Sequence, residues 1–316
     1  MMAAEKSFKE FYQDELVPEL LPFENMRKKV ATIGSIGSGL AILAIISLLI
    51  NQANHIQAFA IVFLILLLPA IIFMVVYYNR KKNYIVGFKE NIIHSIIKFI
   101  DPNLRYDPYS HINSNDYKKS GLFLKGVDRY NGDDYVEGWR DKTVFCFSEL
   151  HTEYMVSTGK STSWHTIFKG LFFIGDFNKH FHGRTYVYSE NNPQLGFFSK
   201  MFSSFASNLE RVNLESTEFE NRFVVYSSDQ VEARYILTPS FMEHLVKLQD
   251  LMGEETSYSF VDTNIYVAVP ISDALFEPSI FSPNSYDRLG DYYNTVHIIF
   301  DIIDELNLNL RIWTKE

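Results

Sequence analysis

Two long apolar runs lie in the N-terminal third of the chain. Residues 30–50 and residues 58–78 each form a stretch of 21 residues without a charge. At about 1.5 Å of rise per residue, a helix of either run is roughly 31 Å long, close to the roughly 30 Å hydrocarbon core of a bilayer. Core helices of soluble proteins are usually shorter and carry polar residues on one face. The pattern predicts a hairpin of two membrane-spanning helices.

The charges beside these runs predict the orientation of the hairpin. Basic triplets lie at residues 27–29 and 80–82, whereas the loop of residues 51–57 contains neither Lys nor Arg. Because Lys and Arg near a span stay on the cytoplasmic side, we expect both termini in the cytoplasm and a multi-pass protein of the inner membrane.

Helical spacing also appears on both sides of the spans. Residues 5–23 read as an amphipathic helix that we expect to pack on the soluble domain, with Pro18 and Pro22 limiting its length. Behind the second span, Phe88, Ile92 and Ile96 lie on one helical face, and Asp101-Pro102 predicts where that helix ends. Small residues in the first span predict close packing against the second span.

The pattern changes to β structure after residue 120. Aromatic and β-branched clusters alternate with turn residues up to about residue 190, which predicts an antiparallel meander, and further strands are expected at residues 223–226, 258–260 and 265–269. Helices are expected at residues 198–209, at 241–252 with a capping box from Ser240 to Glu243, and at the C-terminus from Tyr292 onward. Strands with segregated helices predict an α+β domain behind the membrane hairpin.

These patterns divide the chain into four parts. We expect a cytoplasmic amphipathic segment at residues 1–29, the transmembrane hairpin at 30–78, a juxtamembrane helix and linker at 79–119, and the cytoplasmic α+β domain at 120–316. From residue 83 onward there are 21 Lys and Arg against 32 Asp and Glu, a formal charge of −11. Such a surface repels nucleic acid, so we expect no nucleic-acid partner.

Few residues suggest chemistry. The lone Cys146 lies between two phenylalanines, and no basic residue adjoins it to favour a thiolate. His180 and His182 would share one side of an extended segment, with His165 or Asp176 as further ligands, but no metal-motif spacing accompanies them. We expect neither a metal nor a cofactor. Residues 159–162 copy the end of a phosphate-binding loop without its first glycine, and a hairpin turn is the better interpretation.

Several short motifs point to a family. They are Ser120-Gly121-Leu122-Phe123, Gly132-Asp133-Asp134-Tyr135-Val136-Glu137-Gly138, Phe147-Ser148-Glu149-Leu150, Phe168-Lys169-Gly170-Leu171-Phe172-Phe173, Glu232-Ala233-Arg234-Tyr235, Phe276-Glu277-Pro278 and Arg311-Ile312-Trp313. Together with the two spans, they resemble a family of bacterial membrane proteins, domain of unknown function 3137. The resemblance implies a bacterial origin and a cytoplasmic domain on a membrane hairpin, and it implies no activity.

Two functions remain open beside transport, for which two spans without a charged residue could form a pore only by oligomerising. The first is a membrane-tethered interaction or regulatory module that binds a protein partner, a second copy of itself or a small ligand through an aromatic surface or groove. The second is a membrane-anchored hydrolase or transferase whose acid and base groups converge only in the fold. Its candidates are Asp133, Glu137, Glu149, His151, His180 and His182. An open apolar surface would favour the first function, and a closed pocket with convergent polar groups would favour the second.

Overall fold

A computed structural model of the chain describes residues 7–54, 57–140, 143–159, 161–176, 180–192, 195, 208–253 and 255–310. The chain divides into two compact units. The first comprises Met1–Phe99 and Phe276–Tyr292, and the second comprises Ile100–Leu275 and Tyr293–Glu316. A segment that follows the sheet in sequence therefore belongs to the same unit as the N-terminal helices.

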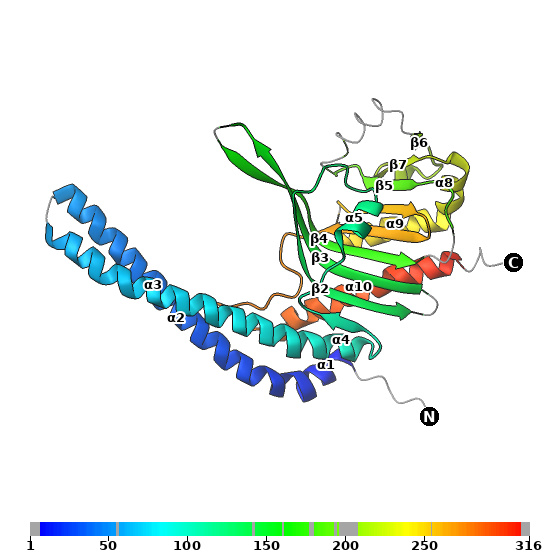
Figure 1. Cartoon of the computed structure of the whole chain (residues 1–316). Helices are drawn as coiled ribbons and strands as arrows, with labels where there is room; N and C mark the ends of the chain where they lie inside the picture. The colour runs from blue at the N-terminus through cyan, green and yellow to red at the C-terminus, as the bar shows by residue number, and fades with distance from the viewer. Residues whose placement is uncertain are drawn as a thin grey trace. The chain divides into compact units, whose positions relative to one another are not determined.

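The first unit is built on two long helices (Figure 1). Helical structure begins at Phe8, where Ser7 accepts a hydrogen bond from the Glu10 amide and completes a capping box. The elements are α1 (Phe8–Phe11), a π-helical turn η1 (Tyr12–Leu16), α2 (Val17–Asn54), α3 (Gln57–Phe88), a second π-helical turn η2 (Lys89–Ile93) and α4 (His94–Ile100). The predicted end at Asp101-Pro102 is confirmed.

The prediction that Pro18 and Pro22 limit the N-terminal helix is wrong. Both residues lie inside α2, which continues through the first apolar run to Asn54. The π-helical turn η1 ends at Leu16, two residues before Pro18, and its wider backbone relieves the crowding that a proline ring causes against the preceding turn. The apolar face of this helix packs within the first unit: Phe11 stacks on Phe99 with ring centroids 4.0 Å apart, and Phe8 contacts Tyr286 at 5.6 Å.

The two helices carry their apolar side chains on the outside. Both are long and apolar enough to cross a membrane, and side chains such as Ile45, Leu64 and Leu68 are 55–66% exposed. A core helix of a soluble protein would bury these groups, so the exposure fits a lipid environment. The spans pack on each other where Gly34 leaves room for the Tyr77 ring. As predicted, the first span therefore finds its partner in the second.

The second unit contains a sheet whose strands are all antiparallel. The strands are β1 (Arg105–Asp107), β2 (Arg129–Arg140), β3 (Thr143–Ser157), β4 (Thr162–Asp176), β5 (Thr185–Ser189), β6 (Glu210–Val212), β7 (Phe223–Ser227), β8 (Ser257–Val261) and β9 (Asn264–Pro270). The helices are α5 (Ser114–Lys119), α7 (Thr217–Glu220), α8 (Gln230–Ile236), α9 (Pro239–Met252) and α10 (Tyr286–Leu310), of which α10 begins in the first unit. The predicted α+β class is confirmed.

The described strands are ordered β1-β2-β3-β4-β9-β8-β5-β7-β6. The meander is confirmed as far as β4, but β5 does not pair with β4 as a simple meander would require. The β8–β9 hairpin lies between them, with Phe172 opposite Ala268 on one side and Tyr186 opposite Ser259 on the other. The far ends of β3 and β4 extend beyond the other strands as a two-stranded arm (Figure 1). The predicted hairpin turn before Thr162 is present, with the Thr158 amide donating to the Ser161 carbonyl.

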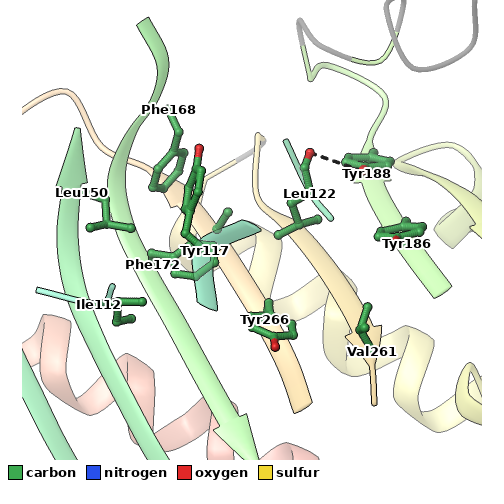
Figure 2. Packing of buried hydrophobic residues seen from close by; sticks show 11 residues of the cluster. Ile112, Tyr117, Leu122, Leu150, Phe168, Phe172, Tyr186, Tyr188, Val261 and Tyr266 are labelled. Atoms are coloured by element: carbon green, nitrogen blue, oxygen red, sulfur yellow. Dashed lines mark hydrogen bonds between the residues drawn. The ribbon is translucent and has the colours of Figure 1, made fainter. Parts of the chain in front are cut away.

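The two faces of the sheet are covered differently. On the helix face, Phe145 packs against Phe300 of α10 and Phe260 packs against Phe241 of α9, each with ring centroids 5.9 Å apart. On the opposite face, which we call the groove face, α5 and the segment after it cover a cluster built around Tyr117, Phe172 and Tyr266 (Figure 2). Two tyrosines hold α5 and the segment after it on the sheet. The Tyr117 hydroxyl lies 3.0 Å from Thr152 Oγ1, and the Tyr188 hydroxyl donates to the Leu122 carbonyl.

Residues 103–119, where we expected a linker, contribute β1 and α5 to this unit. Leu104 and Tyr117 are buried in it. We therefore propose that the independently folding domain begins near Ile100.

Two of the predicted helices lie in the second half of the chain. The helix expected at residues 241–252 is present as α9 and ends at Gly253, but Thr238 caps it, not Ser240, because Pro239 takes the first helical position. The helix expected at residues 198–209 falls almost entirely outside the described residues.

Gly170 is the most constrained glycine of the sheet. Its φ is +150°, and a Cβ atom there would lie 2.1 Å from the Val269 carbonyl oxygen and 2.6 Å from the Ile271 nitrogen. Both contacts are with backbone, which cannot swing away as a side chain can. The close approach lets β4 and β9 pair up to Gly170 and Pro270, the last pair before the arm diverges.

Gly170→Ala is therefore expected to lower the free energy of unfolding by about 3 kcal/mol or more, from backbone strain together with overpacking. Gly126→Ala is the matched control, because a Cβ at this exposed glycine would meet no atom within 4 Å, and its change should stay within about 0.5 kcal/mol. Urea unfolding of the full chain in detergent, followed by near-ultraviolet circular dichroism, measures both. Equal stabilities of the two variants would contradict the packing described here.

Candidate functional site

Toward the β2–β3 turn, no described segment covers the groove face, and an open groove of about 550 Å³ lies there. Its floor comes from alternating positions of neighbouring strands: Tyr135 and Trp139 on β2, Val144 and Cys146 on β3, and Ile174 on β4. The Trp139 and Val144 side chains are 55% and 62% exposed. Because neither residue is covered, the groove offers a large apolar surface to solvent.

Polar side chains form the rim of the groove. They belong to Asn103, Arg105, Glu137, Asp176 and Asn264. The Glu137 carboxylate is held on both oxygens, since Arg105 Nη1 donates to one at 3.0 Å and the Tyr135 hydroxyl donates to the other at 2.9 Å. An apolar centre inside a polar rim is the usual arrangement of a protein-binding surface.

Cys146 lies in the floor of this groove without being activated. Burial raises the pKa of its thiol to about 11, so the thiol is protonated at neutral pH. The neighbouring Tyr135 also has a raised pKa, caused first by burial and then by its interactions with Cys146 and Glu137. The expectation that Cys146 is an inert thiol therefore gains support from its surroundings.

A second cluster lies in the β2–β3 hairpin. Carboxylate oxygens of Asp133, Asp134 and Glu149 are all within 4.8 Å of one another, and Asp134 and Glu149 are buried. The antiparallel register brings Asp133 opposite Glu149, and a β-bulge after Asp133 turns Asp134 inward with a φ of +57°. Three carboxylates at this distance are a possible ligand set for a divalent cation such as Ca²⁺ or Mg²⁺.

Two of these carboxylates have structural partners. The Tyr106 hydroxyl donates to Asp134 Oδ1 at 2.5 Å, which ties β1 to β2, and burial together with the Asp134 charge raises the pKa of Tyr106 above its ordinary value. The Leu275 amide donates to Glu149 Oε2 at 2.6 Å and fixes the chain after β9. The cluster therefore holds β1 and the chain after β9 in place, whether or not it also binds an ion.

The other predicted site residues lie apart from this cluster. Glu137 belongs to the groove rim, and His151 lies on β3 with Nε2 3.4 Å from Thr166 Oγ1. His180 and His182 are exposed, and the His182 amide donates to Glu232 Oε1 at 3.0 Å. Within the described part of the chain, neither joins a group of three metal-ligating atoms.

The sequence did not single out the groove residues Trp139 and Ile174. The alternation along β2 and β3 places Trp139 opposite Val144, but only the structure shows that nothing described covers this pair. A second open cavity of about 520 Å³ lies beside the base of the arm, lined by residues that include Phe123, Phe168 and Ile271. It contains none of the predicted site residues.

No curated protein matches the sequence. A similar solved structure is that of the mycobacterial trehalose monomycolate transport factor A, TtfA, at 9% sequence identity and a TM-score of 0.32, with 64% of this chain and 88% of that chain covered. At this TM-score the likeness carries no argument about fold or function.

The family comparison is more direct. Residues 166–308 match the family described as a protein of unknown function, DUF3137. The matched segment begins in β4 and includes β5 to β9 and most of α10. This match to residues 166–308 confirms the resemblance to the family of unknown function DUF3137 that the sequence motifs indicated.

Proposed function

We propose that this protein is a membrane-tethered interaction module whose groove binds apolar side chains of a protein partner. The observation that carries the proposal is the open groove with its exposed Trp139 and Val144. Removing a large apolar side chain from water contributes about 1.5–3 kcal/mol. Trp and Tyr are also the residues in which the binding energy of protein interfaces concentrates.

The groove is better suited to binding than to catalysis. Its floor is apolar, its thiol is protonated, and its Glu137 carboxylate is occupied by Arg105 and Tyr135. Catalytic sites commonly combine a perturbed acid or base with a pocket that excludes water. This groove is open and offers a surface for contact.

Site-specific photocrosslinking in the native membrane tests the proposal. A photoreactive phenylalanine analogue in place of Val144 should give one discrete crosslinked product. The same analogue in place of Val231 on α8, which is 78% exposed and does not line the groove, should not give this product. Adding Trp139→Asp to the Val144 variant should reduce the product roughly tenfold or more, the effect of losing a central interface residue. Equal crosslinking at both positions would contradict the proposal.

We also propose that the hairpin crosses the inner membrane and leaves both termini in the cytoplasm. The basic triplets at residues 27–29 and 80–82 support this orientation. Beside the apolar runs, Lys28, Lys29, Arg80 and Lys82 are all exposed. The groove would then face cytoplasmic partners. A reducing compartment is also consistent with a chain that contains one cysteine.

The carboxylate cluster favours a second candidate function, a metal-dependent hydrolase or transferase. Asp133 and Glu149, both predicted candidates, converge there with Asp134. A divalent cation bound by three carboxylates can activate water or polarise a carbonyl or phosphoryl oxygen.

Cation-dependent melting separates the two functions. If the cluster only positions backbone, millimolar Mg²⁺, Ca²⁺ or Mn²⁺ should leave the melting temperature of the full chain unchanged. Asp133→Asn is the variant to compare, because it leaves in place the bond from the Tyr106 hydroxyl to Asp134 and the bond from the Leu275 amide to Glu149. A saturable rise that this substitution abolishes would show cation binding to the folded state and make the enzyme the leading function.

A further inference from the structure

The segment Phe276–Tyr292 returns to the base of the membrane hairpin, although 175 residues separate it from the end of α4. Arg27 Nη1 on α2 donates to the Ile280 carbonyl at 2.8 Å. On α3, the Tyr84 hydroxyl donates to the Ser279 carbonyl at 3.3 Å and accepts from Asn284 Nδ2 at 2.7 Å. These contacts fix residues 279–283, which we call the return loop.

The anchoring groups of the return loop are buried and satisfied. Arg27 is 7% exposed, and its guanidinium also donates to both Glu24 oxygens at 2.6 and 2.7 Å. This bond raises the pKa of Arg27 and lowers the pKa of Glu24. Lys89, 4% exposed, pairs with Glu277 at 3.6 Å. A loop held by buried charged groups keeps a defined height along the helices.

That height can be estimated from the apolar runs. Arg27 lies three residues before residue 30, about 4.5 Å along the helix, and Tyr84 lies six residues after residue 78, about 9 Å along the helix. The headgroup layer is about 5–7 Å thick on each side of the hydrocarbon core. For a hairpin that crosses the bilayer, Arg27 would lie within this layer and Tyr84 just outside it, so the return loop would lie at the outer part of the headgroup layer.

The loop presents an unusual side chain at this level. Phe281 is 70% exposed, although the residue before it, Ile280, is 7% exposed. Exposed basic residues lie at a similar height on both helices: Lys28 and Lys29 on α2, and Arg80 and Lys82 on α3. An aromatic side chain beside several cations is the combination with which proteins bind an anionic membrane surface.

We propose that Phe281 inserts into the headgroup layer of the bilayer, and that the surrounding basic residues bind anionic phospholipid headgroups. The partner is the lipid surface itself. The chain would then contact the membrane at a third place, far in sequence from its two spans. This inference rests on the proposed crossing of the membrane by the hairpin, and the experiment separates the two.

Spin labels at three introduced cysteines measure how deeply each position lies in the bilayer. In a Cys146→Ser background, single variants Phe281→Cys, Ile45→Cys and Leu21→Cys carry the label, and the full chain is reconstituted into vesicles of phosphatidylcholine and phosphatidylglycerol. Ile45 lies in the first span and Leu21 lies nine residues before it, and their side chains are 55% and 63% exposed. Oxygen, which concentrates in lipid, and a water-soluble nickel chelate are the two relaxation agents.

The label at Ile45 should be reached by oxygen and protected from nickel, and the label at Leu21 should behave in the opposite way. The label at Phe281 should lie between them, with clearly less nickel access than at Leu21. Nickel access equal to that at Leu21, with Ile45 protected, would overturn the inference alone. Nickel access at Ile45 would overturn the proposed membrane crossing.

A tryptophan keeps the aromatic character of the loop and gives a second measurement. In vesicles that contain brominated lipid, the fluorescence that Phe281→Trp adds to the wild-type signal should be quenched. The fluorescence that Leu21→Trp adds should persist. Equal persistence in both variants would contradict insertion of the loop.

Discussion

The buried guanidinium of Arg27 is the interaction on which the architecture of the first unit depends. A charge with 7% exposure is stable only when its hydrogen bonds are satisfied, and here the partners are Glu24, one turn away, and the Ile280 carbonyl, 253 residues away. Lys89 with Glu277 repeats this arrangement on the second helix. The hairpin is therefore more than a membrane tether, because its base also binds a segment that lies between the last strand and the last helix.

This segment has a further consequence within the second unit. The chain leaves β9 past Lys169, whose ammonium group donates to the Ser272 carbonyl, and past Glu149, which accepts from the Leu275 amide. The next residue, Phe276, belongs to the first unit. The motif residues Gly170 and Glu149 thus contact the backbone that follows β9, and Glu277 lies just beyond it and pairs with Lys89. These contacts position the backbone. This supports an interaction module more than a catalytic site assembled from motif residues.

The sequence predicted what depends on composition and short-range spacing. The two spans follow from uncharged runs, and the β2–β3–β4 hairpins follow from alternating clusters. It failed at Pro18, which the helix tolerates because a π-helical turn precedes it, and it failed in the strand order, where the distant β8–β9 hairpin separates β4 from β5. The site shows the same division. Asp133 and Glu149 were candidates and meet through local hairpin register, but Trp139 was missed because its exposure depends on what covers the sheet.

Amide hydrogen exchange of the return loop tests the central claim, that the hairpin base holds the segment Phe276–Tyr292. In the wild-type chain the Ser279 and Ser282 amides donate to Asn284 Oδ1 and Ser279 Oγ, so they should be protected. Arg27→Ala should speed exchange across residues 279–284 roughly tenfold or more, because the loss of a hydrogen bond from a charged donor costs about 1.5–3 kcal/mol. Exchange in β3 should not change. Unaltered exchange of the return loop in Arg27→Ala would contradict the account.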